Sequence, residues 1–166
     1  MENNQMNETE KIDMLKYNIS RFDHYFASVN FKSSFLVLGN ITILGFVLSK
    51  RVQMDPYIFY IIVLSITSSL IAVLFAIKPY LKRYNGRTSV LFFNDIANVS
   101  DYEYREKINA LLKSEYILDL EGQVHVLAKG LKRKFLYLNI ATATFIFTIV
   151  IFFIYMGFFM ESGGVK

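Results

Sequence analysis

The chain has 166 residues and a net charge of +4, and hydrophobic residues make up 54% of it, a high share for a water-soluble domain. It has no cysteine, and its two histidines, His24 and His125, lie far apart in sequence. This composition excludes a disulfide framework, a thiolate metal site and a cysteine nucleophile, and it predicts no metal site. The apolar residues are gathered in blocks, which indicates an integral membrane protein.

The N-terminal segment, residues 1–32, predicts an amphipathic cytoplasmic helix. Apolar residues recur there every three or four positions and form one stripe, made of Ile12, Leu15, Ile19, Phe22 and Phe26. No proline or glycine separates this stripe from the next apolar block, so we expect one continuous helix. The stripe needs a partner, because an amphipathic helix does not leave its apolar face in water.

Two apolar blocks within residues 33–78 predict a transmembrane hairpin. The first span runs from about Ser33 to Ser49 and is short, and the second runs from about Tyr57 to Ile77. Asp55-Pro56 is typical of a helix start, with an N-cap followed by proline at the first helical position. Lys78-Pro79 is expected to end the second span, because proline cannot continue the hydrogen-bond ladder of a helix.

Residues 79–134 predict a cytoplasmic helical segment. Ser100 and Glu103 have the spacing of a capping box. The helix that follows is expected to carry an apolar side made of Tyr104, Ile108, Leu111 and Leu112. Gly122 is expected to interrupt the chain, so that a second helix begins at about Gln123 and runs directly into the last span.

The third span, residues 135–160, contains no charged residue. At about 1.5 Å rise per residue it is long enough to cross a hydrocarbon core of roughly 30 Å. Residues 161–166 then form a tail on the outside. The predicted fold is an all-α membrane protein, with three transmembrane helices and a small helical cytoplasmic bundle continuous with them.

The distribution of lysine and arginine predicts the orientation in the membrane. The N-terminal segment holds four of these residues and the segment between the second and third spans holds eleven, so fifteen of the eighteen lie on one side of a three-span protein. Basic residues mark the cytoplasmic side. We therefore expect a cytoplasmic N-terminus. The net positive charge is interpreted as contact with anionic lipid and not with nucleic acid.

Few residues of the sequence suggest catalysis or ligand binding. The sequence has no Gly-rich phosphate loop, no G-x-S-x-G and no H-E-x-x-H motif, so we expect neither an enzyme nor a bound cofactor. Asn40 lies in the middle of the first span, where an amide is costly if it faces lipid. An interhelical hydrogen bond is the favoured interpretation of this residue, and a pore-lining role is the alternative.

Basic and amide residues also gather at the three junctions between the spans and the cytoplasm. If the helices bundle, these junctions converge at one level and could bind a phosphate-bearing ligand. The alternative is that they anchor the protein to lipid headgroups, and composition alone favours this second interpretation.

The order and spacing of four segments resemble the transmembrane effectors of bacterial Pycsar anti-phage defence. The segments are FDHYFASVNFKSSFLVLGN (residues 22–40), the Lys78-Pro79 stop, LFFNDIA (residues 91–97) and QVHVLAKGLKRKFLYLN (residues 123–139). The resemblance covers the chain from about residue 12 to residue 155. Asn30 stands where the family tends to have an acidic residue, two positions before the lysine.

This resemblance implies an effector that responds to a cyclic nucleotide from a partner cyclase, disrupts the inner membrane and so aborts infection. Because three spans do not easily enclose a pore, we expect a homo-oligomer. Together with the basic junctions, the resemblance suggests six ligand-binding residues, namely Asn30, Lys32, Arg87, Asn94, Gln123 and Lys134. Two alternatives remain, a membrane anchor that recruits a soluble partner through the N-terminal stripe and a constitutive small channel.

Overall fold

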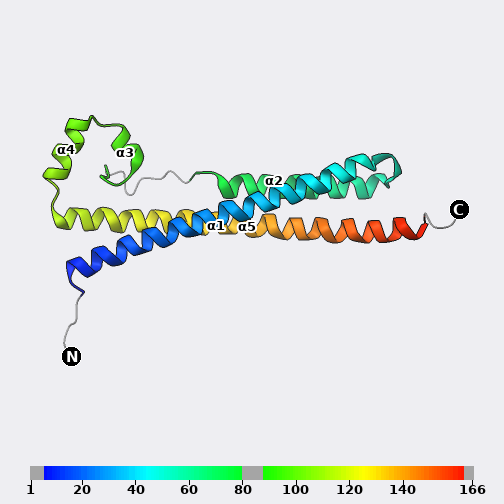
Figure 1. Ribbon diagram of the computed structural model, residues 1–166, viewed down its shortest axis with the longest axis horizontal. Helices are drawn as coiled ribbons and strands as arrows, with labels where there is room; N and C mark the ends of the chain where they lie inside the picture. Colours follow the sequence, from blue (N-terminus) through cyan, green and yellow to red (C-terminus); the bar gives the residue numbers. More distant parts are fainter. Residues whose placement is uncertain (1–5, 80–87, 163–166) are drawn as a thin grey trace, which may run out of the picture. The chain divides into compact units, whose positions relative to one another are not determined.

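The structure is a computed structural model that describes residues 6–79 and 88–162, and these residues form helices without strands (Figure 1). The helices are α1 (Glu8–Ser49), the 3-10 helix η1 (Arg51–Gln53), α2 (Pro56–Ile77), α3 (Phe93–Ala97), α4 (Asp101–Asn109) and α5 (Lys113–Ser162). Three of them, α1, α2 and α5, are long and apolar enough to cross a membrane. The predicted all-α fold with three transmembrane helices is confirmed.

The N-terminal helix and the first span form one helix, as predicted, because α1 runs for 42 residues. Its start is capped by a reciprocal pair, in which Asn7 Oδ1 accepts from the Glu10 N–H at 2.8 Å and Glu10 Oε2 accepts from the Asn7 N–H at 3.0 Å. The buried positions of the second half of α1 are separated by three, four or seven residues and are Val29, Ser33, Leu36, Asn40 and Val47. This repeat is typical of helices that pack side by side along a narrow seam.

The predicted interruption at Gly122 is wrong. The helix α5 continues from Lys113 through Gly122 to Ser162, over 50 residues. A glycine inside a helix costs only about 1 kcal/mol relative to alanine. Its neighbours Leu120 and Val124 belong to a hydrophobic cluster with Leu15 of α1, and this packing outweighs that cost.

The break in the helical segment comes earlier, directly after α4. Because α4 ends at Asn109, Leu111 and Leu112 lie outside it, and the predicted apolar side of that helix is wrong for both residues. The Leu112 N–H donates to Glu115 Oε2 at 3.2 Å, so the first turn of α5 is capped at this point. This side-chain cap therefore fixes the start of α5 at Lys113 and separates α5 from α4.

The chain divides into two compact units, which are described separately. Unit 1 comprises residues 1–26 and 79–132, and unit 2 comprises residues 27–78 and 133–166. In unit 1, Leu15 is buried together with Ile117 and Leu120 of α5, and Ile12 and Ile19 pack against the same cluster. The N-terminal stripe thus finds its partner within the chain.

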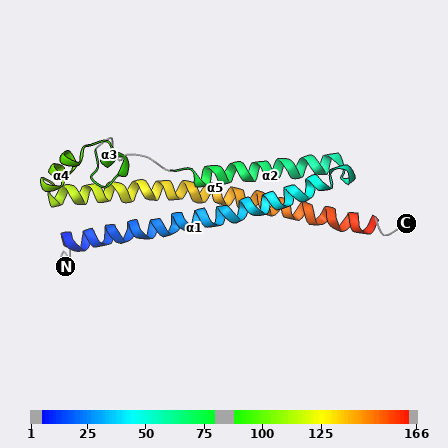
Figure 2. The same cartoon turned by 45° about the horizontal axis from the view of Figure 1, so that its top comes forward.

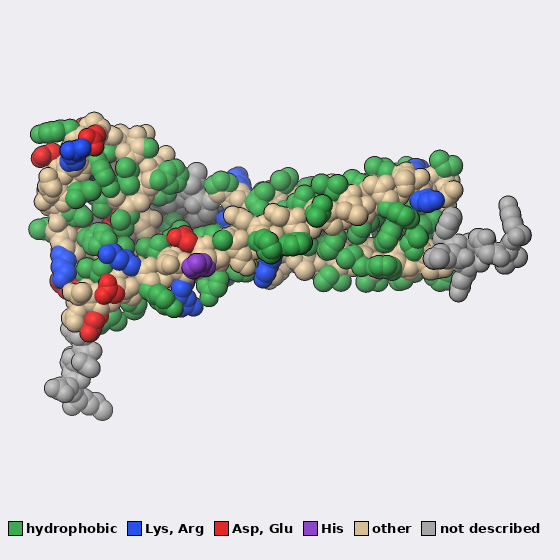
Figure 3. Space-filling model, in the orientation of Figure 1, with side chains coloured by type: hydrophobic (Ala, Val, Ile, Leu, Met, Phe, Trp, Pro, Cys, Tyr) green, Lys and Arg blue, Asp and Glu red, His purple; other side chains and the backbone are tan. Residues whose placement is uncertain are grey.

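Unit 2 is a bundle of three helices, formed by the second half of α1, by α2 and by the second half of α5 (Figure 1; Figure 2). One buried cluster joins Val29 and Leu36 of α1, Val73 of α2 and Leu138 of α5, and a second one lies around Val47, Met54, Ile62 and Ile66. On the face seen in Figure 3, uncharged side chains form most of the surface of unit 2, and charged side chains are concentrated on unit 1. This apolar surface suits contact with lipid.

Both ends of α2 agree with the prediction. Asp55 Oδ1 accepts from the Tyr57 N–H at 2.9 Å and from the Ile58 N–H at 3.2 Å, and Pro56 is the first helical residue. The helix ends at Ile77, directly before Lys78-Pro79. Next to its start, the Arg51 guanidinium lies 4.3 Å from the centre of the Phe59 ring. A contact of this kind between a cation and an aromatic ring contributes about 0.5–1 kcal/mol at an exposed site.

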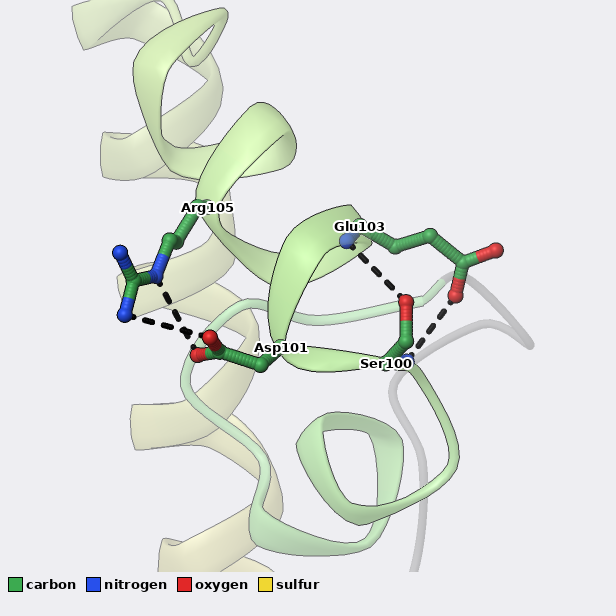
Figure 4. Close-up of polar contacts among 4 residues, drawn as sticks. All are labelled: Ser100, Asp101, Glu103 and Arg105. Carbon is green, nitrogen blue, oxygen red and sulfur yellow. Dashed lines mark hydrogen bonds and ion pairs between the residues drawn. The ribbon is translucent and has the colours of Figure 1, made fainter.

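The predicted capping box of α4 is present (Figure 4). Ser100 Oγ accepts from the Glu103 N–H at 3.2 Å, and Glu103 Oε2 accepts from the Ser100 N–H at 3.0 Å. The hydrogen bond from the Ser100 backbone holds the pKa of the Glu103 carboxyl below its ordinary value.

A lowered pKa in the folded chain makes the N-terminus of α4 sensitive to acid. The ionised Glu103 stabilises α4 at any pH above its unfolded pKa, and this contribution is lost as the pH falls through the lower, folded pKa. We expect faster exchange of the Glu103 and Tyr104 amide hydrogens at pH 3 than at pH 6, after correction for the intrinsic rates. In Glu103→Gln, which keeps a side-chain acceptor, this pH dependence should disappear. An unchanged profile would mean that the capping box is not formed in solution.

Candidate functional site

Unit 1 contains a pocket of about 370 Å³ between the segment that precedes α3, the end of α4 and the first turns of α5. Its volume lies within the range of small-molecule sites. The lining residues are Thr88, Ser89, Val90, Phe92, Asp95, Lys107, Ala110, Leu111, Glu115, Leu118, Asp119 and Gln123.

Ser89 forms hydrogen bonds with several residues of one wall of this pocket. Its Oγ accepts from the backbone N–H groups of Leu91 and Phe92 at 3.0 and 2.9 Å, which holds the turn that leads into α3. The same hydroxyl donates to Asp119 Oδ2 at 2.9 Å and accepts from Gln123 Nε2 at 3.1 Å. Asp119 and Gln123 lie one turn apart on α5, so a single face of that helix fixes the turn.

Two carboxylates complete the wall. Asp119 Oδ2 also accepts from the Val90 N–H at 3.0 Å, and the buried Asp95 accepts from the Ser89 N–H at 2.9 Å through Oδ2. The Tyr104 hydroxyl donates to the Val90 carbonyl oxygen at 3.2 Å and ties α4 to the same residues. Residues 89 and 90 are therefore held from three helices, which makes the wall a fixed surface.

The lining combines apolar walls with charged groups of both signs. Phe92, Leu111 and Leu118 offer apolar surface, and among the described lining residues the carboxylates Asp95, Glu115 and Asp119 outnumber the cation Lys107. Carboxylates accept hydrogen bonds, so they suit the amino and hydroxyl groups of a ligand, and Lys107 suits a phosphate. Among the side chains that the structure describes, no group of three or more His, Asp or Glu could hold a metal ion.

The six predicted ligand-binding residues fall in different places. Gln123 lines the pocket of unit 1. Asn94 is exposed on α3 and is not part of the lining, and Arg87 lies outside the described residues. Asn30 and Lys32 belong to unit 2, where both are exposed.

Lys134, the sixth predicted residue, is also in unit 2, and its side chain is buried. Its Nζ donates to the carbonyl oxygen of Ala76 at 2.7 Å. This contact satisfies one of the carbonyl groups that the last turn of α2 leaves unpaired. Lys134 thus contributes a hydrogen bond between α5 and the end of α2.

Sequence reasoning missed Ser89 and Asp119, which are joined by a hydrogen bond in the pocket wall. Ser89 precedes a short apolar run, and a serine in that position often starts a turn, so a local signal existed. Asp119 carries no such signal, because its partners lie about 30 residues earlier.

Unit 2 contains a second polar group, which we call the polar seam and define as Asn40 of α1, Ser65 and Ser69 of α2 and Thr148 of α5. All four side chains are buried. Asn40 Nδ2 donates to the Leu36 carbonyl oxygen at 2.8 Å and to Ser69 Oγ at 3.0 Å, and Ser69 Oγ donates to the Ala141 carbonyl oxygen at 3.0 Å. The predicted interhelical hydrogen bond of Asn40 is confirmed.

The remaining two members of the polar seam join α2 to α5. The hydroxyl oxygens of Ser65 and Thr148 are 2.7 Å apart, and Ser65 Oγ also contacts the Thr144 carbonyl oxygen at 3.2 Å. Hydrogen bonds between membrane helices contribute on average about 0.6 kcal/mol each. The polar seam therefore stabilises the packed bundle by about 2 kcal/mol, which is small enough for a bound ligand to overcome.

Three apolar helices of membrane-crossing length, together with a helical unit that contains a pocket, define a multi-pass membrane protein with a candidate ligand site. Residues 14–160 match the family model of the Pycsar effector protein domain. Because the match covers most of the chain, the chain belongs to this family and is a membrane effector of antiviral defence. No curated protein and no solved structure matches the chain significantly.

Proposed function

We propose that this effector responds to a cyclic nucleotide, made by a partner cyclase, by disrupting the bacterial inner membrane as a homo-oligomer and so aborting infection. The observation that carries the proposal is the pocket of unit 1, because α5 contributes both to its wall and to the helices long enough to cross a membrane. A ligand shifts a conformational equilibrium only by its different affinities for the two states. A ligand that contacts Asp119 and Gln123 acts on α5 directly.

The proposed ligand site is this pocket, with Gln123, which lines it, as a predicted contact. Asn30, Lys32, Arg87, Asn94 and Lys134 are not among the described residues that line this pocket, and their role stays a separate prediction from the sequence. The N-terminus is proposed to be cytoplasmic, since the basic residues of unit 1 suit that side of the inner membrane. The pocket serves for binding only, and no reaction is assigned to it.

The proposal is tested by membrane permeability in bacteria that express the full chain. Dye uptake and membrane potential are followed while cyclases supply cyclic mononucleotides or dinucleotides one at a time. We expect leakage with one nucleotide and intact membranes without a cyclase. Intact membranes with every nucleotide, when the protein and the nucleotides are both present, would contradict the proposal.

A pair of leucines on unit 1 provides a matched test of the pocket. Leu118 lines it and Leu112 does not, and both side chains are partly exposed. Leu118→Trp is expected to fill the pocket and to suppress the response to the nucleotide, whereas Leu112→Trp should respond as the unaltered chain does. Equal responses of the two variants would exclude the pocket as the ligand site.

The same experiments distinguish the alternatives. A constitutive channel would leak without any cyclase. A membrane anchor that recruits a soluble partner would not leak at all, and it needs a free N-terminal stripe. Because Ile12, Leu15 and Ile19 of that stripe pack against α5, the structure does not favour this alternative.

A further inference from the structure

Two polar atoms inside unit 2 are buried without a hydrogen bond. The Asn40 side chain is 0% exposed, and although its amide nitrogen is bonded, its Oδ1 has no partner among the described residues. Ser33 Oγ, two turns earlier on the same face of α1, is likewise buried and unpaired. A leucine in place of Asn40 has the same number of non-hydrogen side-chain atoms and would avoid this cost. The packing of the helices uses the amide nitrogen of Asn40 but leaves its oxygen unpaired, so packing alone does not explain why an asparagine occupies this position.

Water would satisfy the groups that the packed bundle leaves unpaired. A hydrated Asn40 Oδ1 gains a donor, and the hydroxyl groups of Ser65, Ser69 and Thr148 exchange their partners for water at little cost. The polar seam is thus more compatible with water than the buried apolar positions around it, such as Val47, Ile62 and Ile66. We propose that the polar seam is dry in the resting bundle and lines a water-filled path for small ions in the active state.

The outer face of α2 supports the proposal that the polar seam, and not the outer surface of the bundle, meets water. Leu64, Ile71 and Leu74 of α2 are half exposed or more, and they suit lipid. Thr67 is also exposed, but its hydroxyl donates to the carbonyl oxygen of Val63 in its own helix at 2.8 Å. When the helices separate in a bilayer, the polar seam is the face that water would occupy. This inference rests on the proposed function, because it specifies how the membrane is disrupted.

Opposite substitutions at Asn40 test the proposal. Asn40→Leu replaces the whole amide, including the unpaired oxygen, by an apolar group with the same number of non-hydrogen atoms, so it disfavours hydration of the polar seam. Leakage triggered by a cyclase is expected to fall by about tenfold, the change that 1.4 kcal/mol in the equilibrium produces. Asn40→Asp introduces a carboxylate that requires water, and it is expected to cause leakage without any cyclase. The amount of each variant in the membrane fraction is measured alongside.

Two adjacent serines of α2 allow water in the bundle to be detected directly. Because the chain contains no cysteine, a cysteine introduced in place of either serine is its only thiol. Ser69 is buried in the polar seam, and Ser68 is exposed on the outer face of α2. Ser69→Cys and Ser68→Cys are treated with a charged, membrane-impermeant methanethiosulfonate, which reacts with thiols in water. We expect Ser69→Cys to be modified only during leakage, and Ser68→Cys to stay unmodified throughout.

The outcomes separate this inference from the proposed function. If a cyclase triggers leakage but Ser69→Cys is not modified, or is modified no faster than Ser68→Cys, the inference is wrong and the function stands. If no cyclase triggers leakage but Asn40→Asp does, and Ser69→Cys reacts in that variant, the nucleotide response is wrong and the polar seam stands. If neither a cyclase nor Asn40→Asp produces leakage, both are overturned.

Discussion

Asp119→Ala is expected to abolish the response to the nucleotide while the protein still inserts into the membrane. The substitution removes the acceptor of two hydrogen bonds, from the Ser89 hydroxyl and from the Val90 N–H. Hydrogen bonds to a charged group contribute about 1.5–3 kcal/mol each, so the loss of both costs the wall of the pocket about 3–6 kcal/mol. We expect much faster hydrogen exchange at the Val90 and Phe92 amides, together with loss of leakage.

Two variants control this experiment. Asp119→Asn keeps the shape and one oxygen acceptor, and it should fall between the unaltered chain and Asp119→Ala. Asp101→Ala removes an aspartate whose bond with Arg105 is largely exposed, as in Figure 4, so it should change stability by less than about 1 kcal/mol. Unchanged protection of the Val90 amide in Asp119→Ala would show that this carboxylate does not hold the wall.

The second large effect is expected at Gly39, where α1 and α5 approach closely in unit 2. A Cβ atom on this residue would lie 2.5 Å from Phe145 Cζ and 3.0 Å from Cε2. Gly39→Leu therefore forces the Phe145 ring out of its place, and overpacking of this kind typically costs about 1–3 kcal/mol. We expect the variant to unfold in detergent at a lower temperature than the unaltered chain.

Another glycine of α1 provides the control. A Cβ atom on Gly45 would meet nothing within 4 Å, so Gly45→Leu gains helix propensity without a clash and should stabilise α1 by about 0.5–1 kcal/mol. Phe145→Ala opens the space that Gly39→Leu needs, and the two substitutions together should cost less than the sum of their separate effects. Strict additivity would mean that Gly39 and Phe145 are not in contact.

Patterns of neighbouring residues predicted much of the fold. The capping box of Ser100 and Glu103 and the Asp55-Pro56 start of α2 depend on contacts within one turn of helix, so spacing alone reveals them. Gly122 misled the prediction for the opposite reason. A glycine signals a break only when nothing else stabilises the helix, and the contact of Leu120 with Leu15 of α1 cannot be seen in a local window.

The sequence by itself determined the class of this protein. A helix that crosses a bilayer needs an apolar block of a certain length, and this length can be read directly from the sequence. The apolar stripe of α1 and the helix caps can be read in the same way, because they depend only on residues that are close in sequence. The sequence did not determine the candidate sites. The bonds of Ser89 to Asp119 and of Ser65 to Thr148 join residues that are 30 and 83 positions apart. Only the packing of α5 against the segment before α3 and against α2 brings these groups together, because hydrogen bonds act over a few ångströms of space and are independent of sequence separation.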